Sequence, residues 1–216
     1  MVNVAQILAW IRALQEEYAQ NKQHLTDLDA AIGDGDHGIN MDRGFTKVKE
    51  ELEKASPPDM SGALKTCAMT LVKTVGGAAG PLYGTFFLRA SAACAGKKEL
   101  NASAIAAMVQ AGLDGVVSRG RAQPGDKTMV DALTPAAGQM KKTADSGASI
   151  REMLEQGAKA AEQGMKDTIP MQAKKGRASY LGERSIGHVD PGAVSSFFLI
   201  RTMAEVLGKD YGLFPN

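Results

Sequence analysis

The sequence predicts an all-α fold, a barrel or bundle of about eight helices, and three observations support this prediction. The 216 residues include 33 Ala and 24 Gly, and abundant Ala favours helices because it loses no side-chain entropy there. Aromatic residues make up only 5% of the chain, and no run of Val, Ile, Thr and aromatic residues alternates with polar ones as a strand would. Apolar residues instead recur at the 3.6-residue period along the whole chain.

The predicted helices follow one another with short connections, except for two glycine-rich loops at residues 24–38 and 170–190. In the first helix, Ile7, Ile11 and Leu14 lie on one face. Helices are expected, in chain order, over residues 4–18, 39–55, 61–75, 82–96, 103–119, 128–144, 149–169 and 190–207.

Two of the later helices also carry clear start signals. Ser149 followed by Glu152 is a capping box, and the helix that it opens ends near Pro170. Asp190 provides an acceptor side chain before Pro191, which suits the first position of a helix.

Size and charge predict one cytoplasmic globular domain spanning residues 1–216. Lys plus Arg is 25 and Asp plus Glu is 24, a balance that provides no bulk attraction to nucleic acid or to an acidic membrane. The amino terminus lacks the features of a signal peptide, and no apolar run approaches the ~18 residues of a membrane span. Cys67 and Cys94 lie in apolar stretches, which favours buried reduced thiols in an intracellular compartment.

The first chemical motif is LDAAIGDGDHGIN, in which Asp29, Asp34 and Asp36 lie among glycines. Three crowded carboxylates repel one another unless a cation neutralises them, and hard cations such as magnesium prefer oxygen ligands. A calcium EF-hand does not fit, because Ile39 and Phe45 stand where that loop needs Gly and Glu. The spacing indicates a metal site, and a solvated acidic loop is the alternative.

The second motif is GGAAGPLYG at residues 76–84. Backbone N–H groups at a helix start, unobstructed by side chains, suit a phosphate. A glycine turn that lets two helices pack closely is the alternative, and an isolated loop of this kind more often has that role.

The third motif is SRGRAQPGDKTM at residues 118–129. It approaches a phosphate-binding P-loop, but Asp126 separates Gly125 from Lys127 and no strand precedes it, so that match is rejected. Lys127 and Thr128 are expected either to meet a phosphate or a partner, or to cap the following helix.

The fourth motif, KKGRASYLGERSIGHVDPG at residues 174–192, is a basic loop that precedes a helix start. Arg177 and Arg184 are planar multiple donors suited to phosphate. Acids for a hard cation, combined with several loops suited to anions, indicate a metal–nucleotide site.

The four motifs together resemble the nucleotide-binding L subunit family of dihydroxyacetone kinases. The matching strings are LDAAIGDGDHG, NMDRGF, GGAAGPLYGTFF, DGVVSRGRAQPGDKTMVDAL and KGRASYLGERSIGHVDPGA, from about residue 25 to about residue 195. The resemblance implies a barrel of about eight antiparallel up-and-down helices with the nucleotide site at one rim. It also implies ADP or ATP as cofactor, with two Mg²⁺ ions under the phosphates.

Carried over by position, the resemblance makes Asp29, Asp34 and Asp36 the magnesium ligands. It implies nucleotide contacts for His37, Gly38, Ile39, Asn40, Ala78, Ala79, Gly120, Met129, Arg177, Asp190, Pro191 and Gly192. No catalytic residue is expected in this chain, because the family takes the base for the sugar hydroxyl from its K subunit. Ala79 stands where the family often has Ser, which removes a hydroxyl contact to phosphate worth about 0.5–1.5 kcal/mol.

The implied activity is phosphoryl transfer from the bound nucleotide to dihydroxyacetone held on a partner K subunit. The last motif looks closest to family members whose ADP is recharged in place by a phosphohistidine protein of the sugar phosphotransferase system. The alternatives are an ATP-dependent variant with free nucleotide exchange, and a nucleotide-loaded regulatory module that docks a transcription regulator or another kinase. Neither a membrane nor direct nucleic-acid binding is expected.

Overall fold

The computed structural model describes residues 1–209, and the regular elements in this part of the chain are helices. The one β-type pairing described there is an isolated bridge between Val2 and Leu100. The helices are α1 (Val4–Gln20), α2 (Lys22–Ile32), α3 (His37–Ala55), α4 (Met60–Thr74), α5 (Ala79–Cys94), α6 (Ala102–Gly120), α7 (Met129–Asp145), α8 (Ile150–Asp167), the 3₁₀-helix η1 (Arg177–Ser185) and α9 (Pro191–Leu207). The predicted all-α class is confirmed.

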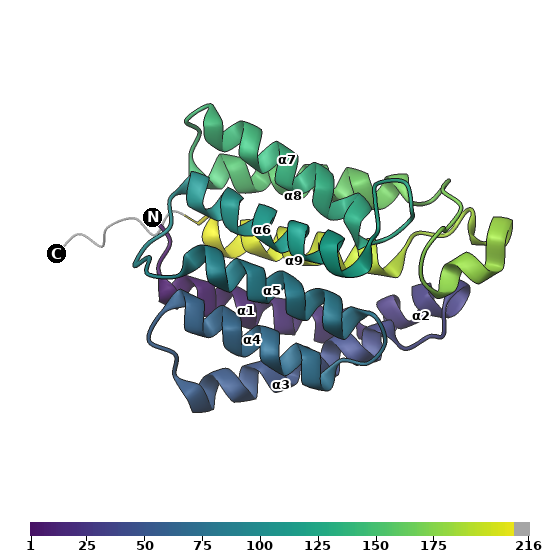
Figure 1. The fold of residues 1–216 in the computed structure, drawn as a ribbon, viewed down its shortest axis with the longest axis horizontal. Coiled ribbons are helices and arrows are strands. Elements are labelled where there is room, and N and C mark those ends of the chain that lie inside the picture. Colours follow the sequence, from purple (N-terminus) through teal and green to yellow (C-terminus); the bar gives the residue numbers. More distant parts are fainter. Residues whose placement is uncertain (210–216) are drawn as a thin grey trace.

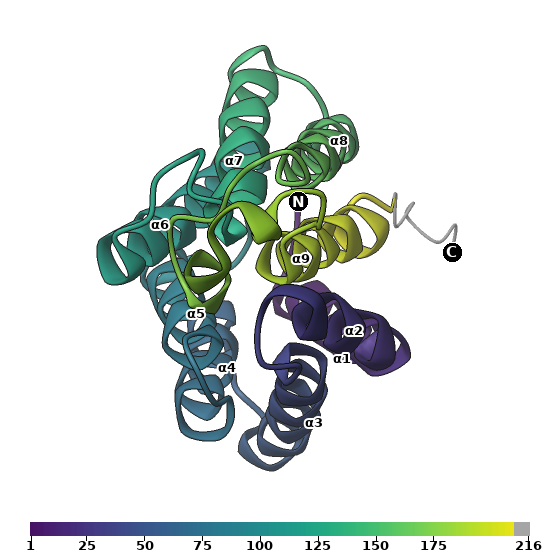
Figure 2. The same ribbon diagram turned by 90° about the vertical axis from the view of Figure 1, so that its right-hand side faces the viewer.

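The long helices pack in an order that closes on itself. Helix α1 contacts α3, each helix from α3 to α8 contacts the next, and α9 returns to α1. Additional contacts of α7 with α9 and of α1 with α4 tie this circuit together. Figure 1 shows the long helices side by side, and Figure 2 shows them nearly end on.

Because the long helices alternate in direction, every second connection lies at the same end of the molecule. The connections α2–α3, α4–α5, α6–α7 and α8–α9 all lie at the right-hand end of Figure 1, whereas the amino terminus lies at the opposite end. These four connections contain the four motifs of the sequence. Alternation alone therefore brings them to one end.

The core between the helices is apolar and includes a cluster of aromatic rings. Phe87 contacts Trp10, Phe45 and Phe86, with ring centroids 5.5 to 6.0 Å apart. Small residues bring some helices close together. A Cβ on Gly112 of α6, for example, would lie 2.5 Å from the Phe86 ring of α5. This core holds the motif-bearing ends of the helices in place.

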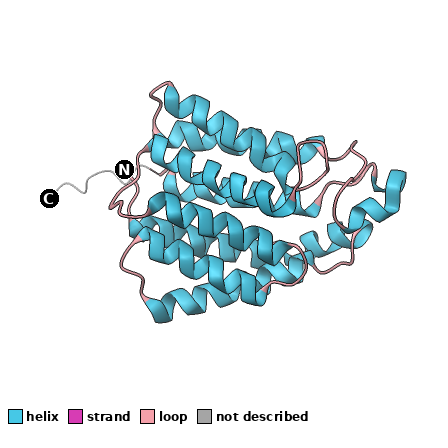
Figure 3. Ribbon diagram, in the orientation of Figure 1, coloured by secondary structure: helices cyan, strands magenta, loops and turns pink. Residues whose placement is uncertain are grey.

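The predicted loop at residues 24–38 is wrong over most of its length. Residues 22–32 form α2, and only residues 33–36 remain as a turn (Figure 3). Leu25, Asp29 and Ile32 form the buried face of this helix, so a polar residue occupies the central position of an otherwise helical apolar pattern. In the second predicted loop, residues 177–185 form a 3₁₀-helix.

Two further expectations concern the cysteines and the membrane. Cys67 and Cys94 are both free and buried, as expected. Among the described residues, no helix combines the length and the apolar character needed to cross a membrane.

Candidate functional site

A cavity of about 1050 Å³ opens at the end of the molecule where the four motif-bearing connections meet. Its walls come from parts of four segments, residues 29–40, 76–83, 116–130 and 174–192. Its volume is that of a site for a whole cofactor, since ligand pockets typically measure about 300–1,000 Å³.

The acidic turn, defined here as residues 33–36 with Asp29, forms one wall of the cavity. Carboxylate oxygens of Asp29, Asp34 and Asp36 lie within 4.8 Å of one another. Asp29 is buried, Asp36 is half-buried and Asp34 is exposed. Converging carboxylate oxygens are the donor set that Mg²⁺ prefers, so these residues fit that ion.

Backbone hydrogen bonds to Asp29 fold this turn onto α2. The backbone N–H groups of Asp36 and His37 donate to Asp29 Oδ2 at 2.9 and 3.1 Å. A Cβ on Gly33 would lie 2.1 Å from Asp29 Oδ1, so a side chain here would displace the Asp29 carboxylate from its present position. Asp29 thus organises the turn that presents the other two acids.

Arg177 connects the acidic turn to the loop between α8 and α9. Its Nε donates to Asp34 Oδ2 at 2.9 Å, and its side chain is 67% exposed. Exposed ion pairs contribute only about 0–1 kcal/mol. The contact therefore places a guanidinium beside the acids without locking it there.

The glycine motif forms the start of α5. Gly77 has φ +62, and Ala78, the N-cap residue, makes no side-chain capping bond. Ala78 and Ala79 line the cavity, so the first backbone N–H groups of α5 lie at its wall. Such groups suit an anionic ligand.

Asn40 lies beside this motif with a defined orientation. Arg43 donates to Asn40 Oδ1 at 2.6 Å and to the backbone oxygen of Thr74 at 3.2 Å. Because the amide oxygen is engaged, Nδ2 is the atom that Asn40 can direct as a donor to a ligand.

Apolar side chains form the wall around Gly120 and Met129. Leu82, Val116 and Ala122 lie on the same side, and Met129 is buried at the start of α7. Such a surface suits a flat ring more than a charged group.

Thr128 has one of the roles that the sequence left open, that of a helix cap, and it also lines the cavity. Thr128 Oγ1 accepts from the backbone N–H of Val130 at 3.2 Å, and Asp131 Oδ2 accepts from the backbone N–H of Thr128 at 2.7 Å. Thr128 therefore caps α7, whereas Lys127 has a buried ammonium with other contacts.

Asp190, Pro191 and Gly192 complete the wall at the start of α9. The Asp190 carboxylate accepts from the backbone N–H of Ala193 at 2.7 Å, and Pro191 occupies the first helical position, as expected. Burial raises the pKa of Asp190 to about 7, with a smaller increase from Asp131.

Three neighbouring residues of the predicted nucleotide segment have different surroundings. His37 lines the cavity, but its Nε2 lies 2.8 Å from Ser195 Oγ, and burial lowers its pKa against the opposing effect of Asp29 and Asp36. Gly38 packs on α2, where a Cβ would lie 2.0 Å from the backbone oxygen of Lys22. Ile39 is 43% exposed and, like Gly38, is not among the cavity-lining residues. Nucleotide contacts of Gly38 and Ile39 stay predictions without support from this geometry.

Sequence reasoning missed a buried polar network beneath the cavity. The Tyr83 hydroxyl lies 2.6 Å from Ser195 Oγ, and the Tyr18 hydroxyl donates to the backbone oxygen of Ser195 at 2.8 Å. Burial raises the pKa of Tyr83 to about 12. No sequence signal marks these contacts, because 112 and 177 residues separate the partners.

Comparison with known proteins places this chain in a family. The DAK2 domain model matches residues 31–205. The chain is 46% identical over 199 residues to the Escherichia coli "PEP-dependent dihydroxyacetone kinase, ADP-binding subunit DhaL", covering 92% of this chain and 95% of that protein. It is 40% identical over 207 residues to the Lactococcus lactis "PTS-dependent dihydroxyacetone kinase, ADP-binding subunit DhaL", covering 96% of this chain and all of that protein.

A solved structure shares the fold. The dihydroxyacetone kinase from C. freundii in complex with AMP-PNP and Mg²⁺ matches with a TM-score of 0.71 and 24% identity, over 93% of this chain and 34% of that chain. This chain therefore corresponds to about a third of that kinase. From the extent of the family match and the identity to full-length relatives, the chain belongs to the DAK2 domain family.

Proposed function

We propose that this protein is the ADP-binding subunit of a dihydroxyacetone kinase, with residues 1–216 acting as one nucleotide-binding domain. The observation that carries this proposal is the convergence of three carboxylates within 4.8 Å at the wall of a cavity whose other walls suit phosphate and an apolar ring. The two ADP-binding subunits with 40 and 46% identity support the same assignment.

Asp29, Asp34 and Asp36 would hold Mg²⁺ beneath the phosphates. Bound Mg²⁺ neutralises the charge on the transferring oxygens. Three carboxylates and a diphosphate together carry about −6 at neutral pH, which favours about two divalent ions over one. Asp29 contributes twice, because it also holds the backbone N–H groups of the turn.

The other walls of the cavity position the nucleotide. The start of α5 at Ala78 and Ala79 provides backbone donors for phosphate oxygens, and Asn40 provides an oriented amide. Arg177 would exchange its exposed contact with Asp34 for a phosphate oxygen. Gly120 and Met129 border the apolar wall for the base.

The acceptor sugar would be held by a partner subunit, which also supplies the group that takes the hydroxyl proton. ADP would stay on this chain and be recharged by a phosphohistidine protein of the phosphotransferase system in the cytoplasm. The relatives named as PEP- and PTS-dependent favour this route over free ATP exchange.

A reconstitution experiment tests the proposed reaction. Purified chain, a dihydroxyacetone-binding subunit, Mg²⁺ and the phosphoryl-donor proteins should together yield dihydroxyacetone phosphate, and omission of this chain should abolish the product. Absence of product, with an active relative of this subunit as positive control, would contradict the proposal.

Native mass spectrometry distinguishes the two nucleotide routes. ADP that survives purification and gel filtration supports recharging in place, whereas rapid exchange with added ATP supports the ATP-dependent variant. The same spectrum counts the bound metal ions, and so tests the proposed pair of Mg²⁺ ions.

A further inference from the structure

Lys127 has an unusual position in the connection between α6 and α7. Its backbone has φ +61, a conformation that residues other than glycine rarely adopt. Its side chain is almost fully buried, with 1% of the residue exposed. A lysine buried in this way needs partners that satisfy its three donors.

Among the described residues, the hydrogen-bond partners of the Lys127 ammonium are all backbone carbonyl oxygens of one loop, the 168–190 loop. Lys127 Nζ donates to the oxygens of Thr168 at 2.7 Å and Met171 at 3.1 Å, and also to that of His188. The oxygen of Ile169 lies at 3.4 Å. Thr168, Ile169 and Met171 lie where the chain leaves α8, whereas His188 lies just before α9. One ammonium therefore joins the two ends of the loop.

Other contacts complete the base of this loop. The backbone N–H of Gly187 donates to the oxygen of Ile169 at 2.8 Å, and that of Asp190 donates to Thr168 Oγ1 at 3.0 Å. The backbone N–H of Lys174 donates to the oxygen of Asp126, next to Lys127 in sequence, at 3.1 Å. The rest of the loop, including Arg177, extends from this hydrogen-bonded base.

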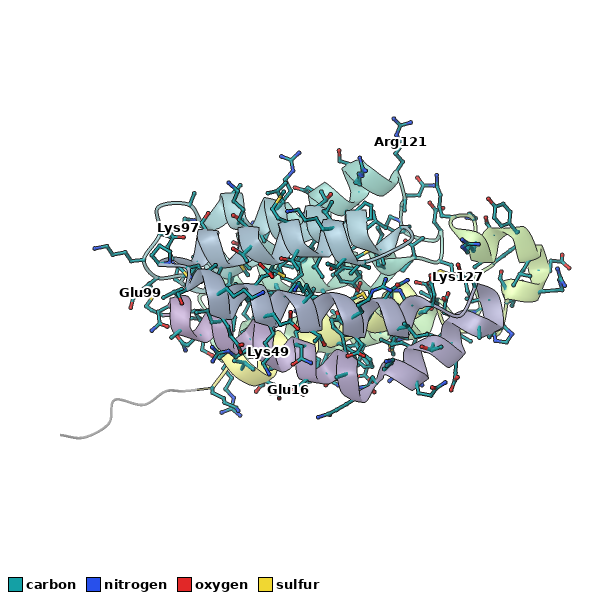
Figure 4. The ribbon with its side chains drawn as sticks, turned by 90° about the horizontal axis from the view of Figure 1, so that it is seen from below. Glu16, Lys49, Lys97, Glu99, Arg121 and Lys127 are labelled. Atoms are coloured by element: carbon teal, nitrogen blue, oxygen red, sulfur yellow. The ribbon has the colours of Figure 1, made fainter. Side chains whose placement is uncertain are left out.

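Arg121 provides a comparison within the same connection. It also has a positive φ, of +51, and it also carries a cation, but it is exposed. In Figure 4 the Arg121 side chain extends away from the molecule, whereas Lys127 lies at the base of the 168–190 loop. The positive φ and the charge are therefore shared, and the contact with the loop is specific to Lys127.

We infer that Lys127 is a positioning residue. Its ammonium fixes the base of the 168–190 loop, and this holds Arg177 and Asp190 at the wall of the cavity. A compact ammonium suits this role, because its three donors can point at carbonyls from both ends of the loop. The effect on nucleotide release rests on the proposed function, but the effect on the loop itself does not.

Hydrogen exchange of the ligand-free protein tests the effect on the loop. In Lys127→Met, we expect the backbone amides of Gly187 and Asp190 to exchange about tenfold faster or more, because charged hydrogen bonds at the loop base are lost. Amides in the middle of α1 and α4 should keep their rates, and Arg121→Met should match the wild type. Unchanged exchange at Gly187 and Asp190, or equal acceleration in α1 and α4, would overturn the inference.

Release of Mg-ADP tests the consequence for the site. We expect Lys127→Met to release ADP about tenfold faster or more, with Arg121→Met at the wild-type rate. Met140→Ala, a core change in α7, provides a variant of lowered stability that should leave release unchanged. If the wild type binds no ADP, the proposed function fails while the exchange result still decides the role of Lys127.

A second variant covers the case in which Lys127→Met does not fold. Lys127→Gln keeps two donors without the charge, and it should show a smaller acceleration at the same two amides. If neither variant folds, Lys127 is a requirement of the whole fold, and the inference is wrong.

Discussion

The acidic turn and the base of the 168–190 loop lie at the same end of the molecule, but their charged groups differ in burial and in hydrogen-bond partners. In the acidic turn, three carboxylates crowd within 4.8 Å, and the cation that meets them, Arg177, is 67% exposed. At the loop base, Lys127 Nζ is surrounded by carbonyl oxygens. In the α6–α7 connection that carries Lys127, Asp131 accepts from two backbone N–H groups.

This difference distinguishes charged groups that stabilise the fold from charged groups that are available to bind a ligand. A buried charge with a full set of internal partners stabilises the arrangement around it. In the acidic turn, Asp29 has such partners, but Asp34 and Asp36 crowd beside it at the cavity wall, and this repulsion lowers stability until a cation binds. The contacts around Lys127 and Asp131 should therefore contribute most to the stability of the ligand-free protein. The acidic turn should contribute most to the stabilisation that a bound ligand provides.

The largest expected effect is on ligand binding by the acidic turn. Asp34→Asn or Asp36→Asn should lose most of the stabilisation that Mg-ADP provides, which is about 4.1 kcal/mol at 1,000 times the dissociation constant. Without ligand, both variants should melt at the wild-type temperature or above it, since carboxylate repulsion falls. Thermal melts with and without Mg-ADP measure both quantities.

Asp42→Asn is the matched control for this experiment. Asp42 is a nearby acid of α3 that pairs with Lys22 at 3.0 Å and is not part of the three-acid cluster. It should keep the full gain from Mg-ADP. If Asp34→Asn and Asp36→Asn gain as much as the wild type, these aspartates are not the metal ligands.

The opposite result is expected in the α6–α7 connection that carries Lys127. Asp131→Ala removes the acceptor for the backbone N–H groups of Gly125 and Thr128, at 2.6 and 2.7 Å. Because hydrogen bonds to a charged group contribute about 1.5–3 kcal/mol, the ligand-free protein should lose about that much stability to urea. A loss that appears only in the presence of Mg-ADP would contradict the contrast between the two regions.

The pH dependence of stability tests how another carboxyl group, that of Asp190 at the start of α9, contributes to the fold. Its pKa is raised from 3.8 to about 7 by burial. A carboxyl with a raised folded-state pKa contributes stability that is present below pH 4 and lost as the pH rises to about 7. Because Asp190 is half-buried at the cavity wall, we expect a loss of about 1–2 kcal/mol over this range.

Asp190→Asn isolates this contribution, because an asparagine can still cap α9. Urea titrations at several pH values should show that the variant lacks this decline between about pH 4 and pH 7. Identical pH profiles for the wild type and the variant would mean that Asp190 is ionised in the folded protein throughout this range.

The smallest expected effect comes from Ala79 at the start of α5. Ala79→Ser adds a hydroxyl at a cavity wall that already has backbone donors. It should tighten ADP binding by about 0.5–1.5 kcal/mol, or roughly 2- to 10-fold, with little change in ligand-free stability. Titration calorimetry measures the affinity, and weaker binding would show that this position does not face a phosphate oxygen.

Local sequence signals predicted most of the helices and the cluster of three acids. The helical period and the caps at Ser149 and Asp190 predicted all the long helices except α2. Helix α2 was not predicted because Asp29 occupies the centre of its buried face, where an apolar residue would complete the helical pattern. The three acids were recognisable from their spacing, because they lie within eight residues of one another.

Only the tertiary structure decided which side chains meet the cavity and which hold its walls. In the sequence, Lys127 and Thr128 were equally good candidates for a phosphate contact and for a helix cap. In the structure, Thr128 caps its own helix, whereas Lys127 Nζ donates to carbonyl oxygens up to 61 residues away. Gly38 lies within the predicted nucleotide segment, yet it packs on Lys22 of the preceding helix. The period of one helix shows which face is buried, but the element that covers that face depends on contacts between segments far apart in the chain.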